Sequence, residues 1–203
     1  AAVGAERAIA IACNIGYKDQ LQNLVDETRS RLGPIDTLIA NAGVNPFYGP
    51  MSEIPDDAFD KTMNSNLRSN HWLCQMVAPD MLAKKRGAIM ITASVGAFGP
   101  SDTLGTYNIS KMADIALVRN LAMEWGPEGV RVNALCPGLI RTDFAKALWD
   151  NPEAAKRVTE QTPLRRFGEA EDFKGIAVFV ASDASAYVTG QALTVCGGTH
   201  MFR

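Results

Sequence analysis

Short apolar strands alternate with long helices along this chain of 203 residues, and this alternation constrains its fold more than any other feature. Residues 8–13 and 35–40 have the composition of buried strands, and a helix is predicted between them over residues 19–32. The second strand runs directly into Asn41-Ala42-Gly43, which is a turn signal. This order favours a parallel α/β sheet, because two parallel strands must be joined by a crossover, usually a helix.

The same alternation continues to the C-terminus. The elements expected after the first turn are a helix at 55–83, a strand at 88–93, a helix at 106–125, a strand at 130–136, a helix at 170–182 and a strand at 192–196. Residues 143–168 are expected to form two short helices, broken at Asn-Pro and Thr-Pro, that are long enough to make a lid. No repeat or linker divides the sequence, so we expect a single domain over residues 1–203.

The composition argues against several classes of protein. The chain is 47% hydrophobic and 21% charged, with a net charge of −2 and no long run of Lys or Arg. We therefore expect neither a nucleic acid nor a membrane as partner. The four cysteines lie at least sixty residues apart and form no cluster with the two histidines. This spacing predicts reduced thiols in a cytoplasmic protein without a metal site.

The two long helices are apolar around more of their circumference than one buried stripe requires. We expect the helices at about 56–83 and 106–125 to pack on the sheet with one face and on another subunit with the opposite face. The protein would then be a homo-oligomer, either a dimer or a tetramer. An entirely intrachain core explains the same pattern equally well.

Tyr107 and Lys111 stand four residues apart at the start of the second long helix. Their side chains therefore share one helix face, with Cβ atoms roughly 5–6 Å apart. Because the pKa of a free phenol is about 10, a tyrosine exchanges a proton near neutrality only when a cation stabilises its phenolate. Lys111 is such a cation. Ser94 follows a predicted strand, so it is expected at the carboxyl edge of the sheet, where parallel α/β folds bind ligands.

Small or polar residues also follow other predicted strands. Asn41-Ala42-Gly43 ends one strand, Pro137-Gly138 ends another, and Asn66 lies in the long helix between them. Each has an ordinary structural explanation: a turn, a strand end or, for Asn66, a hydrogen bond to the backbone of its own helix. Their joint occurrence with Ser94 and Tyr107 indicates a functional site at this edge.

The joint pattern resembles the short-chain dehydrogenase/reductase family over residues 8–199. The stretches that carry the resemblance are 35–43, Asn66, Ser94, Tyr107-x-x-x-Lys111, 131–138, Thr142, Thr189-Gly190-Gln191 and Gly197-Gly198. Residues 45–49 and 138–144 are similar to the carbonyl and retinal reductase branches. The resemblance implies a Rossmann-type doubly wound parallel sheet. It also implies an NAD(P)-dependent oxidoreductase that transfers a hydride between NAD or NADP and a ketone or secondary alcohol.

The resemblance further implies a set of catalytic residues. Tyr107 would be the general acid/base, and Lys111 would lower the pKa of Tyr107 and bind the nicotinamide ribose. Ser94 would hold the substrate oxygen, and Asn66 would anchor a water that relays protons. The expected cofactor contacts are Asn14, Asn41, Ala42, Gly43, Tyr107, Lys111, Pro137, Gly138, Ile140 and Thr142.

A small lipophilic carbonyl compound or alcohol is the expected substrate, because the residues expected to line its pocket are apolar. These residues are Val95, Phe98, Leu104, Phe144, Leu148 and Trp149. For Leu148 and Trp149, packing within the lid is an equally good interpretation.

The sequence departs from the family pattern at its start. The family binds pyrophosphate with a glycine-rich turn after its first strand, and the given sequence has no such turn. Its first predicted strand, residues 8–13, matches the third strand of the family. Two strands and two helices are therefore expected to be absent from the given sequence, which we interpret as part of a longer chain. NAD and NADP preference is set mainly within those elements.

Two other functions remain open at this point. If the chain truly begins at Ala1, a non-catalytic binding or assembly module on the same fold becomes the alternative. A third hypothesis keeps the fold but changes the reaction to epimerisation or dehydration, since both also use Tyr-x-x-x-Lys.

Overall fold

Four parallel strands form one sheet in the order β1-β2-β3-β4. The computed structural model describes residues 7–201, except for the side chains of residues 147 and 148. The strands are β1 (Thr37–Ala40), β2 (Gly87–Thr92), β3 (Val130–Pro137) and β4 (Ala192–Val195). Ala88 of β2 is level with Thr37 of β1 and with Arg131 of β3, and Ala134 of β3 is level with Ala192 of β4. All four strands therefore point their carboxyl ends to the same edge.

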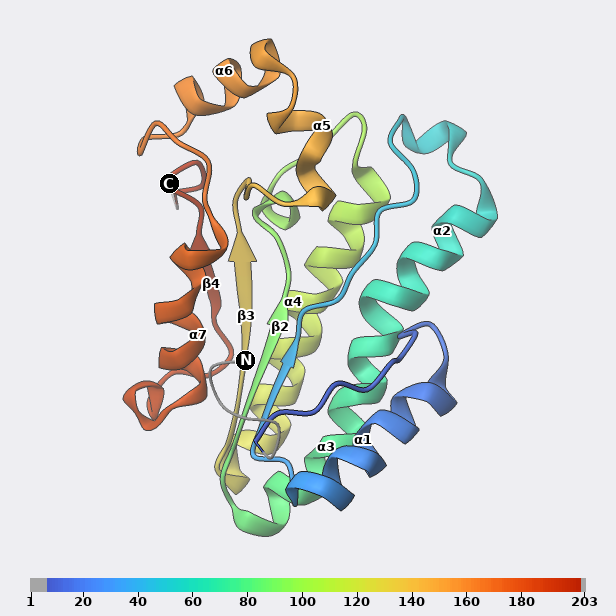
Figure 1. Ribbon diagram of the computed structural model, residues 1–203, viewed down its shortest axis with the longest axis vertical. Coiled ribbons are helices and arrows are strands. Elements are labelled where there is room, and N and C mark those ends of the chain that lie inside the picture. The colour runs from blue at the N-terminus through green and yellow to red at the C-terminus, as the bar shows by residue number, and fades with distance from the viewer. Residues whose placement is uncertain (1–6, 202–203) are drawn as a thin grey trace.

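Helices cover both faces of this sheet (Figure 1). Outside residues 143–168 the α-helices are α1 (Lys18–Leu32), α2 (Asp56–Met63), α3 (Ser69–Lys84), α4 (Gly105–Trp125) and α7 (Lys174–Ala181). Within that segment, α5 (Lys146–Trp149) and α6 (Pro152–Gln161) lie beyond the carboxyl ends of the strands. Short 3₁₀ segments join these elements: η1 (Met51–Glu53), η3 (Val95–Phe98), η4 (Gly126–Glu128), η5 (Asp143–Ala145), η6 (Ala170–Phe173) and η7 (Asp183–Ser185). Among the described helices, none combines the length and the apolar character that crossing a bilayer would require.

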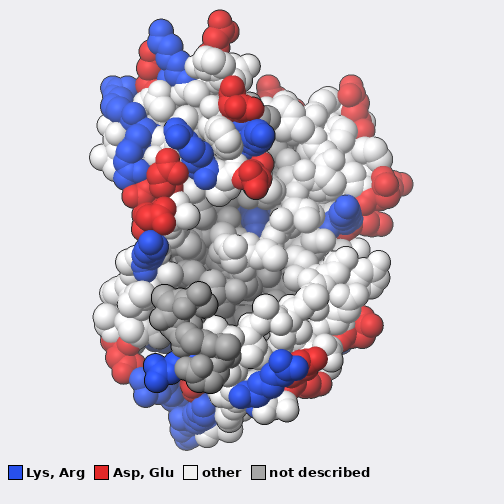
Figure 2. Space-filling view, viewed as in Figure 1, with Lys and Arg blue, Asp and Glu red and all other residues white. Residues whose placement is uncertain are grey.

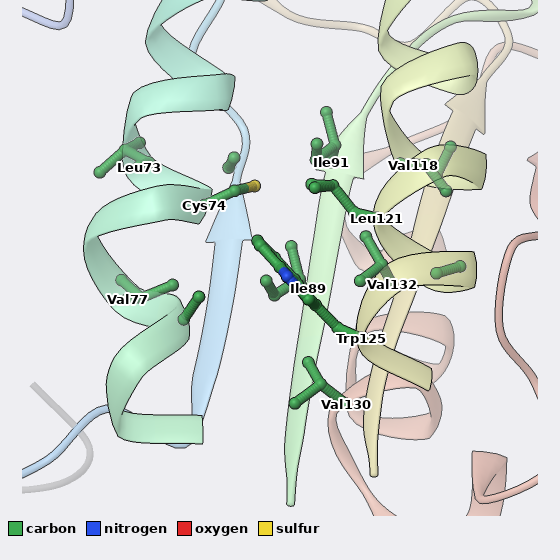
Figure 3. Packing of buried hydrophobic residues seen from close by; sticks show 14 of the residues in the cluster. Leu73, Cys74, Val77, Ile89, Ile91, Val118, Leu121, Trp125, Val130 and Val132 are labelled. Carbon is green, nitrogen blue, oxygen red and sulfur yellow. The ribbon is translucent and has the colours of Figure 1, made fainter. Parts of the chain in front are cut away.

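The central strand β2 is buried on both faces, as a central strand of a parallel sheet should be. Successive side chains of a strand point to opposite faces, so Ile89 and Ile91 enter the larger hydrophobic cluster and Met90 enters a smaller one. Residues of α1, α3 and α4 complete the larger cluster, and residues of α7 complete the smaller one. Figure 3 shows the centre of the larger cluster, where α3, β2, β3 and α4 meet through Leu73, Cys74, Val77, Ile89, Ile91, Val118, Leu121, Trp125, Val130 and Val132.

The long helix predicted over residues 55–83 is present but interrupted. Between α2 and α3 lies one turn of π-helix, η2 (Asn64–Arg68). A π-turn inserts an extra residue into a helix and is frequent at functional sites. Here it places Asn66, a polar residue, in a fully buried position.

The prediction of a strand at residues 8–13 is wrong. No strand is present there, and within the described part of the chain β1 pairs only with β2. A strand is held by hydrogen bonds to a neighbouring strand, and none of the strands in the described part of the chain pairs with these residues. The other predicted strands and helices are confirmed, with ends that differ by a few residues.

Candidate active site

Ser94 and Tyr107 meet at the carboxyl end of β2. Ser94 follows this strand, and its Oγ accepts a hydrogen bond of 3.1 Å from the amide of Gly96, in the first part of the 3₁₀ turn η3. Tyr107 lies in the first turn of α4, and its phenol is close enough to the Ser94 side chain for Ser94 to affect its pKa. Two hydroxyl groups from residues thirteen positions apart are thus brought together at the edge predicted for the site.

Lys111 lies one turn further along α4 and is only 3% exposed. Its Nζ donates a hydrogen bond of 2.7 Å to the Thr92 carbonyl and lies 3.2 Å from Oδ2 of Asp114. The same Nζ is 5.9 Å from the centre of the Tyr107 ring. The ammonium group is therefore inside the site, where its nearest partners are a carbonyl and a carboxylate.

The pKa of Tyr107 is shifted by the surroundings of the phenol. Burial raises this pKa; the Ser94 side chain acts in the opposite direction, and the carboxylate of Asp114 adds to the rise. Lys111, whose ammonium binds Asp114 and the Thr92 carbonyl, is not among the main causes of this shift, so its effect on the pKa of Tyr107 stays a prediction. Tyr107 therefore keeps its proton at neutral pH, which is the state that a proton donor needs.

Asn66 joins the π-turn to the loop after β1. Its side-chain oxygen accepts a hydrogen bond of 2.8 Å from the amide of Val44, and its Nδ2 donates to the Val44 carbonyl and to Oγ of Ser110. The side chain thus bonds to another segment, and the alternative of a bond to its own helix is wrong. These bonds hold the chain after Asn41-Ala42-Gly43 against α4.

The residues predicted to contact a nucleotide lie along the carboxyl edge. Asn41 and Ala42 are exposed just after β1, and the side-chain oxygen of Asn41 accepts a hydrogen bond of 3.1 Å from Thr92. A Cβ atom added at Gly43 would lie 3.5 Å from Nζ of Lys111 and 3.3 Å from Oδ1 of Asn66. Glycine thus keeps the space above the lysine open, which fits a ligand that approaches the backbone closely.

Other predicted cofactor contacts follow β3 and precede α1. Pro137 ends β3, and a Cβ atom at Gly138 would lie 2.8 Å from the Cα atom of Cys196, so only glycine fits there. Ile140 is half-buried and Thr142 is exposed beyond it. Asn14 lies before α1, where its side-chain oxygen accepts a hydrogen bond from Gly16. The exposed polar groups and close-fitting glycines along this edge fit a nicotinamide nucleotide.

The predicted substrate residues fall into two groups. Phe144 lies nearest to the proton donor, with its ring centre 6.0 Å from that of Tyr107, and is 61% exposed. Val95 and Phe98 are partly buried against the core, and Leu104 is half-buried before α4. The structure thus places one of the predicted side chains, Phe144, beside Tyr107.

Hydrogen bonds link residues 143–168, the predicted lid, to the loop after β3. The indole N–H of Trp149 donates a hydrogen bond of 2.8 Å to the Thr142 carbonyl, which favours packing within the lid for this residue. The side chain of Leu148 lies outside the described part of the structure. The end of the lid is tied back to the loop after β3, because Gly168 donates to the Leu139 carbonyl and accepts from the amide of Arg141.

Figure 2 shows a hollow on one face, between the lid helices α5 and α6 and the region of α1. Charged side chains gather on the rims, whereas the visible part of the hollow is mostly uncharged. A cavity of about 170 Å³ lies beside the loop after β3, lined among others by Ile140, Phe167 and Cys196. Among the described residues, no three His, Cys, Asp or Glu side chains are grouped so that they could hold a metal ion.

Three residues near the site escaped the sequence reasoning. Asp114 pairs with Lys111, Asn70 binds Asp114, and the ring of His200 stacks on Phe98 at 4.4 Å between centres. For Asp114 a signal was present, since it is a carboxylate in an otherwise apolar stretch of helix, three residues after the lysine. His200 lies more than ninety residues from Phe98 in the sequence, and no local pattern connects them.

A parallel sheet with helices on both faces and a Ser-Tyr-Lys group at its carboxyl edge defines the class of Rossmann-type oxidoreductases that use a nicotinamide nucleotide. A family model described as enoyl-(acyl carrier protein) reductase matches residues 1–200. The chain belongs to the short-chain dehydrogenase/reductase family, and it is an NAD(P)-dependent oxidoreductase.

Relatives with known names agree with this membership. Dehydrogenase/reductase SDR family member 4 from Oryctolagus cuniculus is 37% identical over 186 residues, which cover 92% of this chain and 72% of that protein. A gluconate 5-dehydrogenase from Burkholderia cenocepacia, in complex with NADP and tartrate, has a TM-score of 0.87 and 31% identity, covering 91% of this chain and 72% of that one. A 7α-hydroxysteroid dehydrogenase, complexed with NADH and 7-oxo glycochenodeoxycholic acid, has a TM-score of 0.87 and 36% identity, covering 92% of this chain and 72% of that one.

Proposed function

We propose that this protein interconverts a ketone and a secondary alcohol, with Tyr107 as the general acid/base. The proximity of the Ser94 hydroxyl and the Tyr107 phenol carries the proposal, because it places two hydroxyl groups where one substrate oxygen can bind both. Burial raises the pKa of Tyr107, so the phenol is protonated at neutral pH and can donate in the direction of reduction.

In reduction, Ser94 and Tyr107 both donate hydrogen bonds to the carbonyl oxygen of the substrate and polarise it. The nicotinamide nucleotide, when bound, supplies the hydride that the carbonyl carbon receives. Tyr107 then gives its proton to the oxygen, so that one hydride and one proton convert the ketone to the alcohol. In oxidation, the tyrosinate takes the hydroxyl proton back. Lys111 lies beside Tyr107, with its Nζ bonded to the Thr92 carbonyl. We propose that this Nζ binds the nicotinamide ribose.

The nucleotide would lie along the carboxyl edge, against Asn14, Asn41, Ala42 and Gly43 at one end and Pro137, Gly138, Ile140 and Thr142 at the other. Exposed polar groups and the glycine above Lys111 support this placement. Asn66 would hold the water that relays protons. Residues 143–168 would close over the substrate as a lid within the single domain.

A lipophilic substrate fits the aromatic side of the site, where Phe144 lies beside Tyr107. Phe98, Val95 and Leu104 would line the pocket more deeply. The 7-oxo bile acid bound by one relative supports an oxo/hydroxyl pair on an apolar skeleton as the reacting group. We therefore propose carbonyl reductase activity towards such compounds.

The test is Tyr107→Phe, assayed with a panel of ketones and alcohols and with both NAD(H) and NADP(H). Turnover should fall at least a hundredfold, because the proton donor is removed while the ring is kept. Tyr187→Phe, at a fully exposed tyrosine, is the matched control and should keep full activity. A Tyr107→Phe protein that is folded by circular dichroism and still turns over would refute the assignment.

The same panel separates the alternatives. Oxidation of NAD(P)H in step with the loss of a ketone excludes simple epimerisation or dehydration. Saturable quenching or enhancement of NAD(P)H fluorescence excludes a module that does not bind the nucleotide.

A further inference from the structure

Asp114 is a fully buried carboxylate inside the candidate active site. It lies on α4, three residues after Lys111, and its Oδ2 is 3.2 Å from the lysine Nζ. Its other oxygen, Oδ1, accepts a hydrogen bond of 2.9 Å from Nδ2 of Asn70 on α3. Both oxygens are therefore bound, which a buried carboxylate requires if it is to stay ionised.

Asn70 links the carboxylate of Asp114 to the π-turn. The same Nδ2 donates a hydrogen bond of 2.6 Å to the backbone carbonyl of Asn66. The side chain of Asn66 holds Val44, next to the predicted nucleotide turn. One carboxylate thus connects Lys111 on α4 with Asn66 on the neighbouring helix.

The titratable groups that interact electrostatically with Asp114 come from three elements. Lys111 is on its own helix, Cys74 is on α3, and Cys136 is on β3. Burial and then Asp114 raise the pKa of Cys74 to about 12. Burial is also the main reason why the pKa of Cys136 is raised to about 11. Both thiols therefore stay neutral near pH 7, and the charge of Asp114 is matched locally by Lys111.

Asp114 acts on Tyr107 in two ways. Its negative charge directly disfavours the tyrosinate. It also holds the Lys111 ammonium by an ion pair, while the Thr92 carbonyl holds it by a hydrogen bond, and this arrangement offsets the positive charge that would otherwise favour the tyrosinate.

We propose that Asp114 is a positioning residue that holds the Lys111 ammonium between itself and the Thr92 carbonyl and thereby sets the pH at which Tyr107 changes from proton donor to proton acceptor. The catalytic meaning of this inference rests on the proposed role of Tyr107. The electrostatic effect itself is open to measurement without any turnover.

The test is an NMR titration of the protein labelled with ¹³C at Cζ of tyrosine. The sequence has four tyrosines, and the resonance lost in Tyr107→Phe belongs to Tyr107. In Asp114→Asn, which keeps the size and removes the charge, the titration midpoint of Tyr107 should move down by roughly one pH unit. Asp57→Asn, at an exposed position on α2, is the control and should leave the midpoint unchanged.

Two further measurements keep the outcome decisive. Asp114→Leu also removes the charge and should move the midpoint in the same direction, whereas Asn70→Ala keeps the charge and should move it much less. In the unaltered protein, the Tyr107 resonance should show a small step near pH 6, where Asp114 ionises. This last measurement needs no Asp114 variant to fold, only the assignment from Tyr107→Phe.

An unchanged or raised midpoint in the folded Asp114→Asn protein, or no step near pH 6 in the unaltered one, would overturn the inference. If the titrations behave as expected but Tyr107→Phe retains turnover, the electrostatic role of Asp114 stands and the proposed function fails. If turnover depends on Tyr107, the alkaline rise of alcohol oxidation should shift in Asp114→Asn by the same amount as the NMR midpoint.

Discussion

Gly138 directly follows β3 and lies against Cys196, which directly follows β4. A Cβ atom at this position would be 2.8 Å from both Cα and Cβ of Cys196, a separation that requires the backbone to move. Gly99 offers a contrast, because a Cβ atom there meets no atom within 4 Å and its φ of −142° suits any residue. The two glycines therefore differ in steric surroundings and can be compared directly.

Gly138→Ala should lower the free energy of unfolding by about 1–3 kcal/mol, because the methyl group overpacks the junction of the two strands. Gly99→Ala should change it by no more than about 0.5 kcal/mol. Urea unfolding followed by tryptophan fluorescence measures both. Equal effects of the two substitutions would show that the contact with Cys196 is relieved without cost.

The buried Asp114 also predicts how stability depends on pH. Burial raises its pKa to about 6, although Lys111 and Asn70 oppose the rise, whereas an unfolded chain has a value of about 4. Between these values the folded state binds more protons, so this group adds stability as the pH falls from 6 towards 4. We therefore subtract the unfolding free energy of Asp114→Asn from that of the unaltered protein. This difference should increase as the pH falls from 6 to 4. A difference that is flat from pH 4 to 7 would contradict the raised pKa.

For single residues, the sequence predicted which side chains lie at the candidate site better than it predicted the electrostatic surroundings of those side chains. Ser94, Tyr107 and Lys111 follow from spacing and from the position of strand ends. The pairing of Lys111 with Asp114 also has a local signal, because the two residues are three positions apart on one helix. The bond from Asn70 to the other oxygen of Asp114 has no such signal, because Asn70 reaches it from α3. Electrostatic properties depend on everything that surrounds a group, including segments distant in sequence.

Arg29 of α1 bonds to α3 at two acceptors, the carboxylate of Asp80 and the carbonyl of Met76. Asp80 accepts a hydrogen bond of 2.8 Å from Nε of Arg29 and one of 2.9 Å from the amide of Ile35. Burial would raise the pKa of Asp80, but these bonds outweigh it and the pKa is lowered. One side chain thus fixes both α1 and the start of the segment that leads to β1.

Asp80→Asn should destabilise the protein at pH 7 by about 1 kcal/mol, since the charge-assisted bonds are weakened and the pair is partly exposed. The pKa is lowered in the folded state, so the contribution is present above the unfolded value near 4 and is lost as the pH falls through the folded value. The two proteins should converge in stability in strong acid. Asp26→Asn is the control, because Asp26 is more exposed and lies 3.7 Å from Arg29. An equal loss in both variants would mean that the tether to α3 contributes nothing.

Most elements could be predicted from apolar periodicity and turn residues, including the break between the two lid helices. The π-turn of η2 could not, because periodicity reports that a segment is helical and not how many residues make each turn. Its stabilisation comes from outside the helix, through the bonds of Asn66 to Val44 and Ser110. The wrong prediction of a strand at residues 8–13 has a similar origin, since an apolar run becomes a strand only when a neighbour pairs with it.

Helix α4 exposes apolar side chains on the surface of the molecule. Ile109, Met112 and Met123 are exposed, the last of them to 81%. We propose that a second copy of the chain covers this helix together with α3, in a dimer or tetramer. Light scattering at micromolar concentration should then give a mass that is at least twice that of one chain, and Met112→Glu should lower it. A mass of one chain at all concentrations would contradict the proposal.

The strand order has a consequence for how the protein is made. Each strand lies beside the one that precedes it in the chain, so the sheet can grow by one strand at a time as the ribosome releases the polypeptide. Ser94, Tyr107, Lys111 and Asp114 all precede β3. The residues proposed to transfer the proton can therefore come together during synthesis, before residues 143–168 and β4 have emerged.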